Sequence, residues 1–372
     1  MNLLIIAPWQ NSVPPIVGSS VENCIYQISK KLALKHKVTV LSRKTKRYPS
    51  SSREGNLTIL RFSAAGASGY LSAALNHVKG RHFDMIQIDN RPGYAPKVRA
   101  FFPNANISVF LHSLTFVSSP MTSRSKALRD LTHANLIVGN SRSLRSNLRA
   151  MFPSLAARVR YVHLGANLQQ FQPPTAGQKA ALRKKYGVSK RFTVVFAGRL
   201  IPRKGIPVLI KAAKIAKRSI PSIKLVIAGG TEKASYKGHL KQLAARQGVS
   251  ARFLGYVTRK RMHEVYRIGD CMVCPSQKHE AFGLVIVESM ACGVPTVASR
   301  IGGIPEIIRN GENGLLVSDF RNPHAFAKAI VNVHKHKSFA RKLSQKARHD
   351  AVNKFGWSAT ASRLESIYRN KG

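Results

Sequence analysis

Acidic residues are scarce in this sequence of 372 residues. Aspartate and glutamate together number 15, against 61 lysines and arginines, so the formal net charge is +46 at pH 7. The first 170 residues hold 23 basic and 5 acidic residues and the remainder hold 38 and 10, which excludes a neutral body with a cationic tail. A positive field of this size attracts polyanions, but it governs association rather than chemistry. The composition leaves open an anionic partner and a solvated basic surface.

Cysteines and long apolar runs are also few. Four cysteines in a chain of this length do not make a disulfide scaffold, which favours a reducing compartment. Cys271 and Cys274 have the C-x-x-C spacing, but they continue an apolar strand-like run and no second pair stands at zinc-finger spacing, so we expect core thiols. No apolar run approaches about 18 residues and the first residues lack a basic n-region, so we expect no membrane span or signal peptide.

Several nucleotide-binding signatures are missing as well. The sequence contains no G-x-x-x-x-G-K-[ST] segment, and Gly229-Gly230 is not continued at dinucleotide-fingerprint spacing, which argues against P-loop enzymes, kinases and dehydrogenases. It also contains no D-x-D pair to hold a metal-bound diphosphate. We therefore expect no metal site and no cofactor.

Short β-branched runs alternate with longer amphipathic segments, which is typical of βαβ units on a parallel sheet. The runs expected to be strands include 3–7, 107–111, 193–197 and 224–228. One series runs to about residue 164, and a second begins near Thr193 after the Pro- and Gly-bearing stretch 171–177. The pattern predicts an α/β fold of two doubly wound, Rossmann-like domains facing across a ligand-binding cleft. We place a first domain at 1–170, a second domain at 171–350, and a C-terminal helix at 351–372 that packs back on the first domain.

The densest motif runs from Pro275 to Pro305. Glu280 precedes an apolar segment that predicts a buried helix, and Glu288 falls within that helix, where an unpaired carboxylate is costly to bury. Phe282-Gly283 stands at the helix entrance, where backbone N–H groups and the helix dipole favour a phosphate. A vicinal diol such as a ribose suits the carboxylate of Glu288, because a carboxylate accepts two hydrogen bonds.

Other interpretations of these two acids stay open. A pair of carboxylates also occurs in glycosidases, but here one lies in a loop and the other inside a helix. Taken by itself, Glu280 is consistent with an exposed acidic residue in a loop. Taken by itself, Glu288 is consistent with an ion pair to one of the many arginines.

The E-x7-E spacing of Glu280 and Glu288 resembles the signature of retaining glycosyltransferases of family 4, which have the GT-B fold. The segment from Phe196 to Gly205 resembles the family's G-R-L-x3-K-G motif, and the resemblance implies that Arg199 and Lys204 neutralise the donor diphosphate. It implies metal-independent transfer of a hexose, with these cations and a helix end in place of the metal.

The resemblance extends to most of the chain and implies that 1–170 is the acceptor-side domain and 171–350 the nucleotide-sugar-binding domain. It implies that His112, Glu280, Arg199 and Lys204 are the catalytic residues. It further implies donor-binding roles for Gly18, Gly198, Arg199, Lys204, Tyr256, Val257, Glu280, Ala281, Phe282, Gly283, Leu284 and Glu288. The segment from Ile301 to Gly314 matches the closing, structural part of the nucleotide domain.

Two further features refine this comparison. Many members carry Gly-Gly after the first strand, whereas this sequence has Gly18 followed by Ser19. The segments Asp89–Lys97 and Phe355–Trp357 are similar to the spore-coat SA-type branch of the family, found in endospore-forming bacteria.

The sequence thus predicts a retaining glycosyltransferase that uses a nucleoside-diphosphate sugar, with a UDP-sugar favoured. The acceptor is open among an anionic polymer, a glycan and a lipid, and the location is bacterial cytoplasm, with peripheral membrane or spore-coat association open. The alternative is a basic coat or envelope-associated structural protein that keeps the fold without transfer activity. Nucleic acid is not expected as a partner, because no aromatic-interleaved basic motif is present. The oligomeric state is open.

Overall fold

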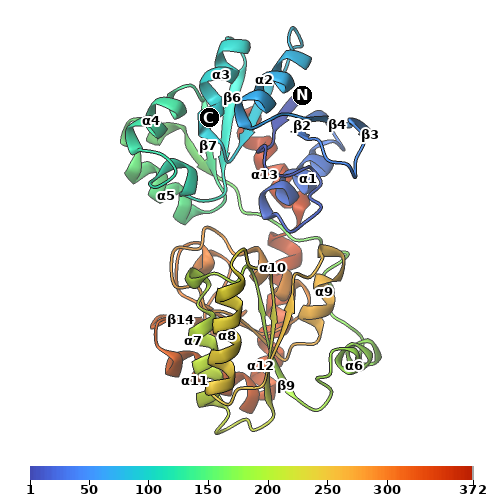
Figure 1. Ribbon diagram of the computed structural model, residues 1–372, viewed down its shortest axis with the longest axis vertical. Coiled ribbons are helices and arrows are strands. Elements are labelled where there is room, and N and C mark those ends of the chain that lie inside the picture. The colour runs from blue at the N-terminus through green and yellow to red at the C-terminus, as the bar shows by residue number, and fades with distance from the viewer. Residues whose placement is uncertain (371–372) are drawn as a thin grey trace. The chain divides into compact units, whose positions relative to one another are not determined.

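The computed structural model describes residues 1–370, which form two compact units (Figure 1). Unit 1 consists of Met1–Leu164 together with the C-terminal segment that starts at Trp357, and unit 2 consists of Gly165–Gly356. Each unit contains one sheet with helices packed on it, so the predicted α/β class with two doubly wound domains is confirmed.

Unit 1 is built on an eight-stranded sheet in the order β3-β4-β2-β1-β5-β6-β7-β8. Its strands are β1 (Asn2–Ile6), β2 (Lys37–Arg43), β3 (Ser51–Glu54), β4 (Leu57–Phe62), β5 (Met85–Asp89), β6 (Asn106–Leu111), β7 (Leu136–Gly139) and β8 (Val159–Tyr161). All neighbouring pairs are parallel except β3 with β4. The central strands β1, β5 and β6 are almost entirely buried because helices cover both faces of a parallel sheet.

The helices of unit 1 come from both ends of its sequence. They are α1 (Ser20–Leu32), α2 (Ala67–His77), α3 (Ala95–Phe101), α4 (Arg124–Thr132), α5 (Arg142–Met151) and α13 (Trp357–Arg369), with 3-10 turns η1 (Pro92–Tyr94), η2 (Thr115–Val117) and η3 (Pro153–Arg158). Helix α13 packs against α1, so the end of the chain completes the unit formed by its beginning (Figure 1).

Unit 2 has a six-stranded parallel sheet in the order β11-β10-β9-β12-β13-β14. Its strands are β9 (Phe192–Ala197), β10 (Ile223–Ala228), β11 (Ala251–Gly255), β12 (Cys271–Cys274), β13 (Thr296–Ser299) and β14 (Leu315–Val317). Its helices are α6 (Ala176–Lys185), α7 (Ile206–Ala216), α8 (Ala234–Arg246), α9 (Arg259–Arg267), α10 (Leu284–Ala291), α11 (Pro323–Lys335) and α12 (Lys337–Lys354), with η4 (Pro202–Lys204) and η5 (Ile304–Glu306).

The helices of unit 2 are divided between the two faces of its sheet. Helices α7, α8 and α11 pack together on one face, and α9, α10 and α12 pack together on the other. The first face closes over a core of strand and helix side chains that includes Phe196, Leu209 and Phe326. The carboxyl ends of the parallel strands therefore lie at one edge of the sheet, where the loops that follow β9 and β12 emerge.

The boundaries between the units lie at Leu164/Gly165 and Gly356/Trp357, whereas the sequence placed them at 170/171 and 350/351. Packing explains the difference. Phe171 is 0% exposed and its ring contacts that of Tyr266 in unit 2, with the ring centroids 5.9 Å apart. Ala166 pairs with Gly356 in an isolated β-bridge. The two chain segments that connect the units therefore belong to unit 2 at these residues.

The four cysteines are buried thiols, and none is in a disulfide within residues 1–370. Burial raises the pKa of Cys274 to about 11 and that of Cys292 to about 12. Cys271 and Cys274 are therefore core residues of β12, as the sequence predicts.

Candidate functional site

Two loops of unit 2 meet at the carboxyl edge of its sheet. Strands β9 and β12 are hydrogen-bonded neighbours, so the loop after β9 adjoins the loop after β12. Gly205 has a φ of 71°, and a Cβ atom there would lie 1.8 Å from the carbonyl oxygen of Pro275. Glycine at this position lets the two loops touch, which brings the G-R-L-x3-K-G segment to the E-x7-E segment.

Lys204 and Glu280 form an ion pair across these loops, between Nζ and Oε2. The hydroxyl of Ser276 also donates to Oε2 of Glu280, at 3.2 Å. Burial alone would raise the pKa of Glu280, but the nearby Lys204 ammonium and the hydrogen bonds outweigh it and hold the pKa below its ordinary value. Glu280 is therefore an ionised, partly buried carboxylate at neutral pH.

The backbone of Glu280 is fixed by the segment that precedes η5. The N–H of Gly303 donates to the carbonyl oxygen of Glu280 at 2.8 Å. A Cβ atom on Gly302 would lie 2.2 Å from that same oxygen. The Gly302-Gly303 pair therefore supports the Glu280 loop, which gives a physical role to a segment that the sequence marked as structural.

Helix α10 begins directly after this loop. Gly283 is its N-cap residue, with a φ of 113°, and glycine has no side chain with which to cap the first-turn N–H groups. Ala281 and Phe282 are buried, and the Phe282 ring packs on Phe355 with the centroids 6.0 Å apart. The Phe282 ring is therefore part of the hydrophobic core, so only the backbone from Ala281 to Leu284 is suited to contact a ligand.

Glu288 lies on α10 and is 4% exposed. Its Oε1 accepts a hydrogen bond from Nη2 of Arg259 at 2.9 Å, and its Oε2 accepts one from the Tyr266 hydroxyl at 2.8 Å. Both partners belong to α9. The ion pair with an arginine, one of the interpretations left open by the sequence, is therefore present.

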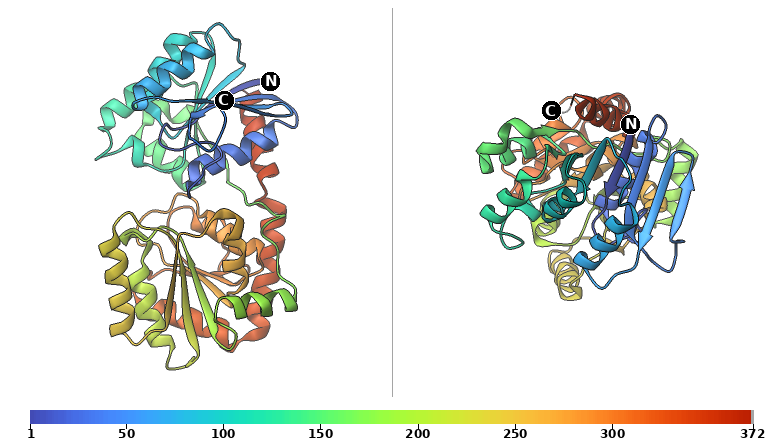
Figure 2. Two further views of the ribbon diagram at one scale, coloured as in Figure 1. Left: turned by 45° about the vertical axis from the view of Figure 1, so that its right-hand side comes forward. Right: turned by 90° about the horizontal axis from the view of Figure 1, so that it is seen from above.

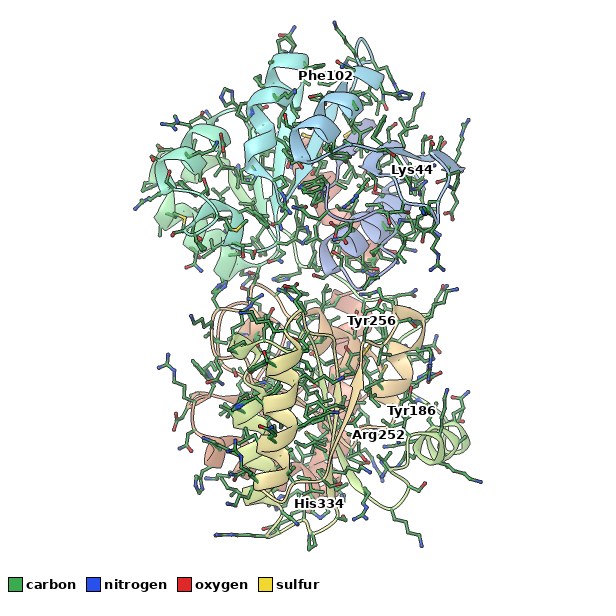
Figure 3. All side chains as sticks on the ribbon, viewed as in Figure 1. Lys44, Phe102, Tyr186, Arg252, Tyr256 and His334 are labelled. Atoms are coloured by element: carbon green, nitrogen blue, oxygen red, sulfur yellow. The ribbon has the colours of Figure 1, made fainter. Side chains whose placement is uncertain are left out.

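The remaining residues predicted in unit 2 lie on neighbouring loops. Gly198 and the exposed Arg199 follow β9, and Tyr256 and Val257 follow β11. Tyr256 and Val257 line a pocket of about 260 Å³ together with Tyr186 and Arg252. The labelled side chains of Figure 3 show Tyr186, Arg252 and Tyr256 along the same flank of unit 2.

Gly18 and His112 belong to unit 1. Gly18 lies in the exposed loop before α1. His112 follows β6, and its Nε2 lies 3.0 Å from Oδ1 of Asp89. The ring also packs on Phe110, with the centroids 4.8 Å apart. His112 is therefore held at the carboxyl edge of the first sheet.

Sequence reasoning missed the partners that orient these groups. Arg259 and Tyr266 fix Glu288, and Asp89 fixes His112, yet none of the three stands in a motif with Glu288 or His112. Among residues 1–370 no group of three or more His, Cys, Asp or Glu side chains is placed to hold a metal ion. Within that range, no helix combines the length and apolarity that a bilayer crossing requires.

Comparison with known proteins gives the class of this molecule. Residues 178–350 match the family described as Glycosyl transferases group 1. The chain is 28% identical to Spore coat protein SA of Bacillus subtilis over 99% of both chains.

Solved structures give the fold. The chain superposes on sucrose-phosphate synthase of Thermosynechococcus elongatus with a TM-score of 0.85 and 23% identity, over 100% of this chain and 99% of that one. It superposes on Anabaena HepE, solved with UDP and glucose, with a TM-score of 0.81 and 19% identity over 100% of both chains.

The fold is therefore that of the GT-B glycosyltransferases. Residues 178–350 are a glycosyltransferase group 1 domain. The predicted family resemblance, the predicted GT-B fold and the predicted enzyme class, a glycosyltransferase, are therefore confirmed.

Proposed function

We propose that this protein is a retaining glycosyltransferase that moves a hexose from a nucleoside-diphosphate sugar to an acceptor hydroxyl. The observation that carries the proposal is the ion pair of Lys204 and Glu280, at adjoining loops and beside the glycine-started helix α10. A cation and backbone N–H groups suit a diphosphate, and a carboxylate suits sugar hydroxyls. A UDP-sugar is the favoured donor, which the fold shared with UDP-bound HepE supports.

The ion pair is compatible with donor binding. A lysine ammonium has three N–H donors, so Lys204 can keep its ion pair with Glu280 and still donate a hydrogen bond to a diphosphate oxygen. Arg199, on the same loop and exposed, adds a planar guanidinium that suits two phosphate oxygens at once. Glu280 and the backbone of Ala281–Leu284 then face the sugar.

Glu288 can still serve the ribose although it is already paired. A carboxylate offers about four lone-pair sites, and Arg259 and Tyr266 occupy one on each oxygen. Their bonds fix the orientation of the carboxylate, so two sites stay available for a vicinal diol. Tyr256 and Val257 are assigned to the nucleobase, and Gly18 and His112 of unit 1 to the phosphate and the transferred sugar.

Catalysis in this proposal rests on stabilising the leaving group. The bond between the anomeric carbon and the phosphate oxygen breaks, and the acceptor oxygen forms a bond to that carbon on the same face. The acceptor proton passes to the leaving phosphate, so no general base is assigned to the protein. Negative charge grows on the phosphate as the bond breaks, and the preorganised Arg199 and Lys204 stabilise that state more than the ground state. No metal takes part.

The acceptor is proposed to be an envelope or coat component: an anionic polymer, a glycan or a lipid. The net charge of +46 supports an anionic acceptor or an anionic surface beside it. The same charge, with the similarity to Spore coat protein SA, favours a second candidate, a coat-associated structural protein that binds by electrostatic adhesion.

A donor screen tests the proposal. We expect the purified chain to hydrolyse one class of nucleotide-sugar slowly without acceptor, and proton NMR of freshly released sugar to show the anomer of the donor. Release of the opposite anomer would contradict retention. Titration calorimetry with UDP, ADP and GDP separates the two candidates, since the structural protein binds none of them.

A further inference from the structure

A line of buried polar side chains runs through unit 1 from its C-terminal helix to His112. Asp89 ends β5 and is 1% exposed, and its Oδ1 lies 3.0 Å from Nε2 of His112. Its other oxygen, Oδ2, accepts a hydrogen bond from the side-chain amide of Gln87 at 2.5 Å. Asp89 therefore has a bonded partner on each carboxylate oxygen.

Gln87 is bonded in turn to α13. Its side-chain oxygen accepts a hydrogen bond of 2.7 Å from the hydroxyl of Tyr368, which lies 281 residues further along the chain. The Tyr368 hydroxyl also lies 3.4 Å from Oγ of Ser108, the residue paired with Gln87 on β6. Burial raises the pKa of Tyr368, so the hydroxyl stays protonated and donates.

The direction of each bond is consistent along the line. Tyr368 donates to the amide oxygen of Gln87, whose nitrogen donates to Asp89. An ionised carboxylate only accepts, so the proton between Asp89 and His112 lies on Nε2 of His112. Nδ1 is then the ring nitrogen left to contact a substrate hydroxyl.

Burying the polar side chains of this line costs free energy, so we expect their burial to serve a function. Strand β5 lies between β1 and β6, and all five of its residues are buried. Gln87 and Asp89 are two residues apart, so they face the same side of the sheet. Apolar residues would pack there without the cost of desolvating an amide and a carboxylate. The polar line ends on the one side chain of unit 1 that is assigned to the transferred sugar.

We propose that Tyr368, Gln87 and Asp89 are positioning residues that hold the imidazole of His112 with Nε2 on Asp89, which leaves Nδ1 for a hydroxyl of the substrate. The inference rests on the proposed function for its chemistry. Similar partners of metal-binding histidines fix the tautomer and the ring orientation, and their loss costs about 10- to 100-fold in activity.

The packing of α13 on unit 1 fixes the position of Tyr368, the first residue of the polar line. Helix α13 packs against α1, and its Glu365 lies 3.1 Å from Nε2 of His36. Figure 2 shows α13 alongside the sheet of unit 1. The C-terminal helix thereby contributes Tyr368 to the line that ends at His112, although Trp357 is its only residue within the family segments.

Tyr368→Phe tests the line because it removes one hydroxyl and keeps the ring. We expect kcat to fall about 10-fold while the KM of the donor stays within about 2-fold, since the ring is misplaced but donor binding is not. Tyr70→Phe is the matched control. Tyr70 is also buried in unit 1, and its hydroxyl donates to the carbonyl oxygen of Ala7 at 3.1 Å, so its loss affects stability but not His112.

Two further readouts separate positioning from a general loss of stability. In a His112→Ala background, Tyr368→Phe is expected to have no further effect on kcat, because it acts through His112. Long-range proton–nitrogen NMR of the His112 ring is expected to show a proton on Nε2 in the wild type and changed ring shifts in Tyr368→Phe but not in Tyr70→Phe.

Unchanged ring shifts in Tyr368→Phe, or an equal loss of kcat in both tyrosine variants, would overturn the positioning role. If the wild type turns over no nucleotide-sugar, the proposed function fails, and the NMR comparison still decides whether Tyr368 positions His112.

Discussion

Lys204 and Glu280, separated by 76 residues in the sequence, form an ion pair in unit 2. The pair exists because Gly205 allows the loops after β9 and β12 to touch at the edge of the sheet. A cation and a carboxylate are therefore held in place by the fold itself, before any ligand binds. Such preorganisation is what a site for a charged transition state requires.

The two cations of the loop after β9 give the first prediction. Replacing Arg199 or Lys204 by Ala should lower kcat/KM by about 100-fold, if each acts like a removed oxyanion donor. Lys214→Ala is the control, since Lys214 is an exposed lysine of α7 outside the site. Steady-state donor hydrolysis measures the effect, and wild-type rates in both site variants would contradict the phosphate role.

The ionisation of Glu280 gives the second prediction. The pKa of Glu280 is lowered in the folded state, so its contribution to stability is present above the unfolded pKa and is lost as the pH falls through the folded pKa. The stability advantage of the wild type over Glu280→Gln should be constant above about pH 5 and disappear on further acidification. Urea unfolding between pH 7 and pH 3 measures it; an advantage that grows toward low pH would show that the pairing is misassigned.

Glu288 gives the third prediction. Glu288→Gln should weaken UDP binding about 10-fold with the fold intact, because a neutral amide is a poorer acceptor for the ribose diol than a carboxylate. Glu312→Gln is the control: it removes another ion-paired acid of unit 2, bonded to Arg309 at 2.6 Å, with no assigned nucleotide contact. The thermal shift on adding UDP is the readout, and an equal shift in both variants would mean that Glu288 serves structure alone.

The close approach at Gly205 gives the fourth prediction. Gly205→Ala places a Cβ atom against the Pro275 carbonyl oxygen and strains a positive φ, so we expect a loss of more than about 1 kcal/mol of stability together with lost activity. Gly238→Ala is the opposite case. Gly238 lies within α8 with no atom within 4 Å of the added carbon, so the variant should gain about 0.5–1 kcal/mol. Chemical unfolding of the two variants measures the expected decrease and the expected increase in the free energy of unfolding.

Much of the fold could be predicted from the sequence because parallel strands buried on both faces are continuous apolar runs. Strands β1, β6, β9 and β10 were predicted in this way. Strand β3 was not, because Ser51–Glu54 contains no apolar residue, and β14 was not, because it has three residues. Their strand conformation depends on the neighbours that they pair with.

The site was predictable where its residues share a local motif. The spacing of Glu280 and Glu288, and of Arg199 and Lys204, is visible in the sequence. The line from Tyr368 to His112 was not, since residues 87 and 368 become neighbours only when α13 folds onto the first sheet. The sequence also required a partner for Glu288, but tertiary packing alone selects Arg259 from among 61 basic residues.

Calorimetric titration of UDP into the wild type and Lys204→Ala tests the central claim most directly, that unit 2 holds a nucleoside diphosphate between these loops. We predict saturable one-to-one binding by the wild type and an affinity at least about 10-fold weaker in the variant, as expected for a lost charge-assisted hydrogen bond. Equal affinities, or no binding by the wild type to UDP, ADP or GDP, would contradict it.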